Sequence, residues 1–158
     1  MNRMTTKFLV FTVLVLQAVP ATAQLSGTTF GGIPLWADST LRGAGLMLSS
    51  ELNPLYVIGD FDRDGLPDIA VEVKDGSLRC GLAILHRIDH SLHIIGAGRP
   101  VGNGSNEIAC GEGWGIQPAQ FAPHDGLVSP DLLYVTAGWH DGGWLVWNGT
   151  TYVWVAWG

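Results

Sequence analysis

Hydrophobic residues along this chain alternate with polar ones or form short runs rich in β-branched side chains, a pattern typical of β-strands. The first predicted strands cover residues 55–58, 68–74, 81–88 and 92–97. Asp75-Gly76 and residues 89–91 are turn-forming and separate the last three of these strands. The pattern therefore predicts a three-stranded antiparallel meander between residues 68 and 97.

The C-terminal part repeats this organisation. Its predicted strands cover residues 114–116, 132–137, 144–147 and 151–155. Asp141-Gly142-Gly143 is expected to form a turn, and Asn148-Gly149 is a strong hairpin signal. The fold class is therefore predicted to be mainly β. We expect antiparallel meanders, arranged like a propeller blade or as a small sandwich, in one domain from residue 24 to residue 158.

One short helix is expected before the strands. Asp38-Ser39 is a candidate N-terminal cap, and the helix is predicted to run to about Ser50. Leu41, Ala44 and Leu48 would share one face of this helix.

The N-terminus has the pattern of a secretory signal peptide. Arg3 and Lys7 precede an apolar run, and Ala21-Thr22-Ala23 forms a small-x-small cleavage site. The run is too short to span a membrane. We therefore expect residues 1–23 to be removed and the protein to be exported, either to the periplasm or to the medium.

Charge and cysteine content narrow the possible partners and the compartment. Loss of Arg3 and Lys7 changes the formal net charge from −6 to −8, and no basic cluster remains, so nucleic acid and anionic membranes are poor partners.

Cys80 and Cys110 are the two cysteines. An even count in an oxidising compartment favours a disulfide between them over two free thiols or a nucleophilic cysteine.

The stretch from Asp60 to Asp68 has the pattern of a calcium-binding loop. Alternating carboxylates, a glycine at the sharp turn and a backbone carbonyl supply the oxygen ligands that calcium requires. The predicted ligands are Asp60, Asp62, Asp64, the carbonyl of Leu66, and Asp68, with Gly65 at the turn. An EF-hand would need a glutamate at position 12, where this chain has Val71, and flanking helices instead of strands.

This loop, Gly59-Asp60-Phe61-Asp62-Arg63-Asp64-Gly65-Leu66-Pro67-Asp68, with the strand that follows it, resembles the calcium loop of FG-GAP/VCBS repeats. The resemblance implies that the carboxylates at positions 1, 3, 5 and 9 and a carbonyl at position 7 bind calcium. The segments 93–98 and 145–149 are similar to those of small exported bacterial proteins of unassigned role. One such loop is present, so a whole propeller is not expected from this chain.

Aromatic and histidine residues form two further groups. Five of the seven tryptophans lie between Trp139 and Trp157, and they either fill a β-core or line a ligand groove. The possible ligand surface consists of Trp144, Trp147, Tyr152 and Trp154. His86 and His93 are expected to face each other across a hairpin with His90 at its tip, and we interpret them as polar residues on a solvated strand face rather than as zinc ligands.

These observations favour a non-enzymatic, calcium-stabilised module that binds a protein or a glycan outside the cytoplasm. Two alternatives remain open. One is a hydrolase of cell-wall or polysaccharide material, with candidate residues Asp125, Asp131, His124 and His140. The other is a periplasmic inhibitor or immunity-type protein. Asp60→Ala or Asp64→Ala is expected to abolish stabilisation by calcium, whereas His86→Ala is not.

Overall fold

The computed structural model describes residues 32–101, 105–108, 113–118, 131–137 and 141–157. In these residues a helix, α1 (Leu35–Gly43), precedes a series of strands. The strands are β1 (Met47–Leu48), β2 (Tyr56–Gly59), β3 (Asp68–Lys74), β4 (Cys80–Leu85), β5 (Leu92–Gly96), β6 (Gly113–Pro118), β7 (Asp131–Ala137), β8 (Asp141–Trp147) and β9 (Tyr152–Ala156).

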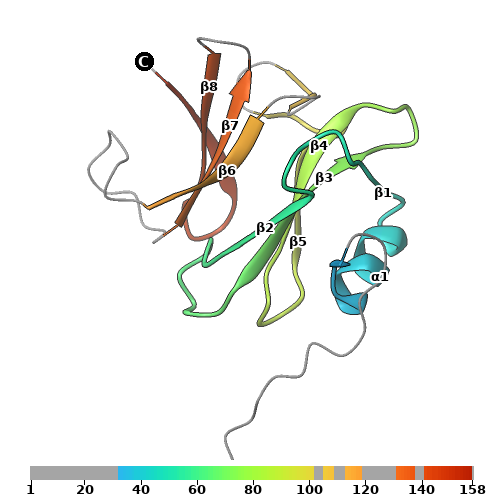
Figure 1. Ribbon diagram of the computed structural model, residues 1–158, viewed down its shortest axis with the longest axis horizontal. Helices are drawn as coiled ribbons and strands as arrows, with labels where there is room; N and C mark the ends of the chain where they lie inside the picture. The colour runs from blue at the N-terminus through green and yellow to red at the C-terminus, as the bar shows by residue number, and fades with distance from the viewer. Residues whose placement is uncertain (1–31, 102–104, 109–112, 119–130, 138–140, 158) are drawn as a thin grey trace, which may run out of the picture.

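The strands form two antiparallel sheets (Figure 1). The first sheet has the order β1-β3-β4-β5, and β2 also pairs with β3. Leu48 of β1 lies opposite Val73 near one end of β3, and Gly59 of β2 lies opposite Asp68 at the other end. The second sheet has the order β6-β7-β8-β9. Both predicted meanders are therefore confirmed, and the fold is mainly β with one short helix.

The two sheets pack against each other around a shared core. Side chains of the first sheet, such as Ala70, Leu82 and Ile84, contact those of the second, such as Leu133 and Leu145. A face-to-face pair of sheets is a sandwich, which was one of the two predicted arrangements.

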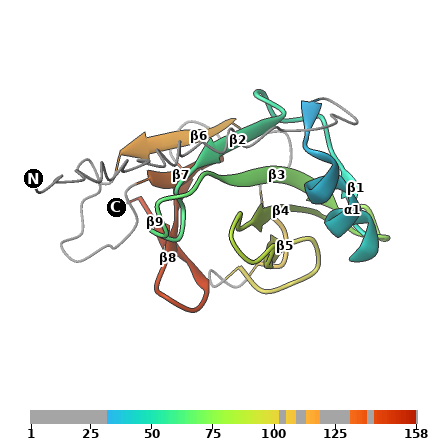
Figure 2. The same ribbon diagram turned by 90° about the horizontal axis from the view of Figure 1, so that it is seen from below.

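Helix α1 covers the outer face of the first sheet (Figure 2). Ala37 and Leu41 pack there against Val71, Val73 and other buried side chains. Because α1 covers one face of β3 and the second sheet covers the other, the first six residues of β3 are all buried. No helix in the described part of the chain is long and apolar enough to cross a membrane.

The predicted bounds of the helix are wrong. It spans Leu35–Gly43, and no side chain caps its N-terminus; Asp38 lies in the first turn and accepts a hydrogen bond from Arg42 Nε at 2.9 Å. Gly45 has a φ of 72°, a left-handed conformation that ends helices. The chain then extends, and Leu48 packs into the same cluster from strand β1.

The predicted turn at residues 141–143 is also wrong. These residues begin β8, where Gly142 pairs with Thr136 and Gly143 pairs with Val135. A Cβ at Gly143 would lie 2.5 Å from the carbonyl oxygen of Val155, and one at Gly142 would lie 2.6 Å from the ring of Trp157. The glycines therefore admit a close approach of backbone and aromatic rings within a strand.

Cys80 begins β4 and is buried. Its predicted partner, Cys110, lies outside the described residues, as do the expected signal peptide and its cleavage site. The disulfide and the cleavage therefore remain predictions.

Candidate metal centre

The acidic loop connects β2 to β3 at one end of the first sheet. Pairing of Gly59 with Asp68 brings its two ends together, so the residues between them form a tight excursion. Gly65 has a φ of 82°, as expected for a sharp turn, and Arg63 also adopts a left-handed φ, of 73°. The amide of Arg63 donates to Asp60 Oδ1 at 2.8 Å, which stabilises this conformation.

Three of the predicted ligands come together in this loop. Asp60, Asp62 and Asp64 each place a carboxylate oxygen within 4.8 Å of the others. Backbone amides orient these carboxylates: Gly65 donates to Asp60 Oδ2, Asp64 donates to Asp62 Oδ1 at 3.0 Å, and Leu66 donates to Asp64 Oδ1 at 2.7 Å. The group is an acidic cluster that could hold a metal ion.

Asp68 belongs to a neighbouring group rather than to this one. It is buried and accepts hydrogen bonds from the amides of Phe61 at 3.0 Å and Arg87 at 2.9 Å. Burial raises the pKa of Asp68 to about 6, with a further contribution from the charge of Asp62. Ligand atoms of Asp62, Asp68 and His86 lie within 4.8 Å of one another, so Asp62 belongs to both groups.

His86 connects the loop to the second sheet. Its Nδ1 lies 3.2 Å from Asp62 Oδ2, and its Nε2 lies 2.7 Å from the hydroxyl of Tyr152. Burial, followed by the charges of nearby carboxylates, raises the pKa of Tyr152, so this phenol stays protonated. A chain of polar contacts therefore runs from Asp62 through His86 to Tyr152 at the start of β9.

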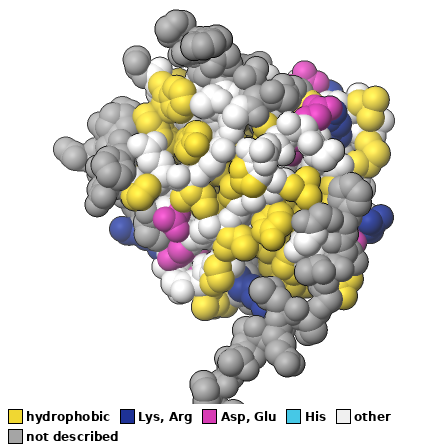
Figure 3. All heavy atoms as spheres, in the orientation of Figure 1, with side chains coloured by type: hydrophobic (Ala, Val, Ile, Leu, Met, Phe, Trp, Pro, Cys, Tyr) yellow, Lys and Arg dark blue, Asp and Glu magenta, His cyan; other side chains and the backbone are white. Residues whose placement is uncertain are grey.

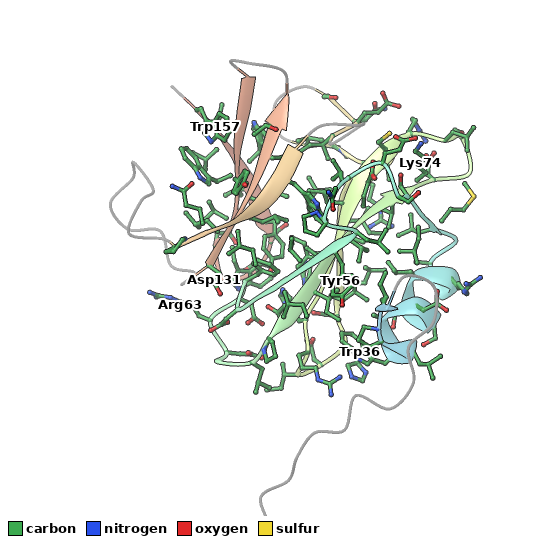
Figure 4. The ribbon with its side chains drawn as sticks, in the orientation of Figure 1. Trp36, Tyr56, Arg63, Lys74, Asp131 and Trp157 are labelled. Carbon is green, nitrogen blue, oxygen red and sulfur yellow. The ribbon has the colours of Figure 1, made fainter. Side chains whose placement is uncertain are left out.

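The second sheet also contacts Asp60, the first residue of the acidic loop. Asp131 Oδ2 accepts a hydrogen bond from the amide of Asp60 at 3.0 Å. In Figure 4, Asp131 lies at the end of the second sheet, close to the labelled Arg63 of the loop. Asp131, a candidate residue of the hydrolase alternative, thus contacts the acidic loop. The loop is thus attached to β7 and to β9.

The prediction that His86 lies on a solvated strand face is wrong. The prediction that His86 and His93 face each other across a hairpin is correct. Strand alternation continued beyond β4 places His86 on the side of Leu82 and Ile84, which faces the sandwich core, and its exposed fraction is 3 %. The rings of His86 and His93 do face each other, with centroids 4.5 Å apart. His90 lies elsewhere, stacked on Trp36.

The predicted aromatic surface is divided between the two faces of the second sheet. Trp147, Tyr152 and Trp154 pack on the inner side, against the core shared by both sheets. Trp144 packs on the outer side with Val146 and Leu132. The other predicted site residues, Asp125, His124 and His140, lie outside the described part of the chain.

A further acidic group lies near the other end of β3. Oxygens of Glu51 and Glu72 lie close to the sulfur of Cys80. Lys74 forms an ion pair with Glu51, and Glu72 Oε2 accepts the amides of Glu51 and Leu52, each at 3.1 Å. Glu72 therefore fixes the position of the segment that precedes β2.

Sequence reasoning missed His86 and Asp131 as contacts of the loop. For His86 a signal was present, because the alternation of β4 points this residue inward. For Asp131 there was none, because its contact with Asp60 joins residues 71 positions apart. The chain matches no protein-family model, and comparisons with curated proteins and with solved structures also find no match.

Proposed function

We propose that this chain is an exported β-domain whose β2–β3 loop binds a structural calcium ion and which acts as a binding module. The observation that carries the proposal is the convergence of the Asp60, Asp62 and Asp64 carboxylates within 4.8 Å. Like charges held so close repel one another, and a cation between them removes that repulsion. The proposed calcium ligands are these three carboxylates and the carbonyl of Leu66, completed by water.

The chemistry of the donors favours calcium over other common metals. All three carboxylates supply hard oxygen ligands, which suit calcium or magnesium. Zinc sites usually include nitrogen or sulfur ligands, and the two ring nitrogens of His86 already contact Asp62 and Tyr152. Calcium accepts a variable number of ligands in irregular loops, whereas magnesium demands near-octahedral geometry.

The place of Asp68 differs from the one that the FG-GAP/VCBS resemblance implies. Both of its oxygens accept backbone amides, from Phe61 and Arg87, which anchor the loop to β3 and to the end of β4. We propose that Asp68 supports the ion site from this position, because its ligand atoms group with those of Asp62 and His86 and not with those of Asp60 and Asp64.

Isothermal titration calorimetry with calcium tests the site. We expect one site in the wild-type protein, with Kd in the range of about 10⁻⁴–10⁻³ M that is typical of extracellular modules. Asp60→Asn and Asp64→Asn should abolish the heat of binding. The matched control is Asp89→Asn, because Asp89 accepts the amide of Ser91 in an ordinary turn. Equal binding by all variants would refute the assignment.

The binding role is supported by an apolar groove on the surface. It has a volume of about 110 Å³ and is lined by side chains that include Trp36, Tyr56, Ile58 and Pro67. Ile58 is 48 % exposed. Hydrophobic side chains gather across the face drawn in Figure 3, and Tyr56 lies near the centre of the same view in Figure 4.

Binding to a panel of soluble polysaccharides and extended peptides tests this role. Ile58→Asp should abolish a response at the groove. A response that this variant does not change would place the contact elsewhere. Export is tested by mass spectrometry of the protein recovered outside the cytoplasm, which should begin at Gln24.

A further inference from the structure

We propose that His86 is a positioning residue for the ion in the β2–β3 loop, that it fixes the carboxylate of Asp62, and that Tyr152 fixes the tautomer of His86. This inference rests on the proposed calcium site and extends it to residues outside the loop. It also links ion binding to the contact between the two sheets, because Tyr152 belongs to the second sheet.

The carboxylate of Asp62 is held at both oxygens. Asp64 donates its amide to Oδ1 at 3.0 Å, and His86 Nδ1 lies 3.2 Å from Oδ2. Asp62 therefore keeps one orientation before the ion arrives, with the remaining lone pairs of both oxygens available to the cation. Without His86, the carboxylate would rotate more freely, and its ordering would then oppose ion binding.

The contacts of the imidazole define its tautomer. An ionised carboxylate only accepts hydrogen bonds, so Nδ1 of His86 carries the proton that it donates to Asp62. In the neutral ring Nε2 then accepts, and the hydroxyl of Tyr152 donates to it across 2.7 Å. The opposite tautomer would place a lone pair of Nδ1 against Asp62, so the hydrogen bond from Tyr152 selects the tautomer that holds the carboxylate.

Ring packing prevents His86 from turning away. Its ring centroid lies 4.5 Å from that of His93, 4.9 Å from that of Trp147 and 5.8 Å from that of Tyr152. Its side chain is 4 % exposed. An imidazole packed in this way presents Nδ1 to Asp62 in a fixed direction, which a solvent-exposed histidine would not do.

The loss of an outer-shell partner of a metal ligand typically weakens metal binding by about 10–100-fold. We expect the low end here, because calcium sites tolerate variation and the loop retains its own amide contacts. His86→Ala should therefore raise the calcium Kd about tenfold. The variant should weaken the site without abolishing it.

The test measures calcium Kd by calorimetry in wild type, His86→Ala, His86→Asn and Tyr152→Phe, with unfolding in chelator measured in parallel. His86→Asn should restore most of the affinity that His86→Ala loses, because the asparagine amide nitrogen replaces Nδ1 as donor. Tyr152→Phe keeps the ring and should weaken binding by about two- to threefold, as the tautomer is released. Nitrogen NMR should show Nδ1 of His86 protonated and Nε2 unprotonated.

The outcomes distinguish this inference from the proposed function. Wild type that binds no calcium refutes the calcium site, and the role of His86 fails with it. Wild type that binds, together with variants that bind equally well, refutes the role of His86 alone. A purely structural His86 would lower stability in chelator without changing Kd. If His86→Ala does not fold, the inference is tested by the calcium Kd of Tyr152→Phe and by the tautomer of His86 in the NMR spectrum. A ring protonated at Nε2 refutes the inference.

Discussion

Removal of one carboxylate from the acidic loop should have opposite effects on stability with and without calcium. The variant is Asp64→Asn, because its side-chain oxygen still accepts the amide of Leu66 while the negative charge is lost. In chelator the variant should be more stable than wild type, since the repulsion with Asp60 and Asp62 is relieved. In calcium it should be less stable, since the ion no longer binds.

The magnitudes follow from the geometry. Carboxylate oxygens that lie within 4.8 Å of one another repel by about 1 kcal/mol in a water-like dielectric, which suits the exposed Asp64. With two such pairs and screening by salt, the gain in chelator should be about 1 kcal/mol. For wild type, about 10 mM calcium at the expected Kd adds about 1.4–2.7 kcal/mol, which the variant loses.

Urea unfolding in calcium and in chelator measures both free energies. The control is again Asp89→Asn, which should shift stability equally in the two conditions. If Asp64→Asn lowers the free energy of unfolding by the same amount with and without calcium, the aspartate acts only as a turn former, and the reasoning about charge repulsion fails.

Three further predictions concern the surroundings of the loop and the second sheet. Asp131→Ala should cost about 1–2 kcal/mol in urea unfolding, because the amide of Asp60 loses its acceptor; Asp131→Asn, which retains an acceptor, should cost less. In chelator, the free energy of unfolding should fall as the pH rises from the ordinary pKa of an aspartate to about 6, the pKa of Asp68 in the folded protein. Over this range the folded state binds more protons than the unfolded chain. Asp68→Asn should remove this dependence of stability on pH. Gly143→Ala should destabilise by about 1–3 kcal/mol through overpacking against Val155, whereas Gly76→Ala, at an open position, should change stability little.

The sequence predicts the strands best where alternation and turn residues agree. The bounds of β3, Asp68–Lys74, match the prediction because the acidic loop and Asp75-Gly76 delimit it on both sides. The helix was extended too far because Leu41 and Leu48 fit a helical period as well as they fit a helix followed by a short strand. In such a case tertiary packing, here that of β1 on β3, decides the structure.

The acidic loop could be predicted because all its carboxylates lie within one short segment. Its supports could not, because they come from distant residues. Asp131 and Tyr152 reach the loop only because the second sheet packs against the first, and no local pattern specifies that packing. His86 is intermediate: its inward direction follows from strand alternation, but its contact with Asp62 requires the folded loop.

The most direct test of the central claim is thermal unfolding of residues 24–158 in about 10 mM calcium, in the same concentration of magnesium, and in chelator. The account predicts that calcium raises Tm by several degrees above the value in chelator, and that magnesium raises it less. The same Tm in all three conditions would contradict the account, because it would mean that the converging carboxylates of Asp60, Asp62 and Asp64 bind no ion in the native state.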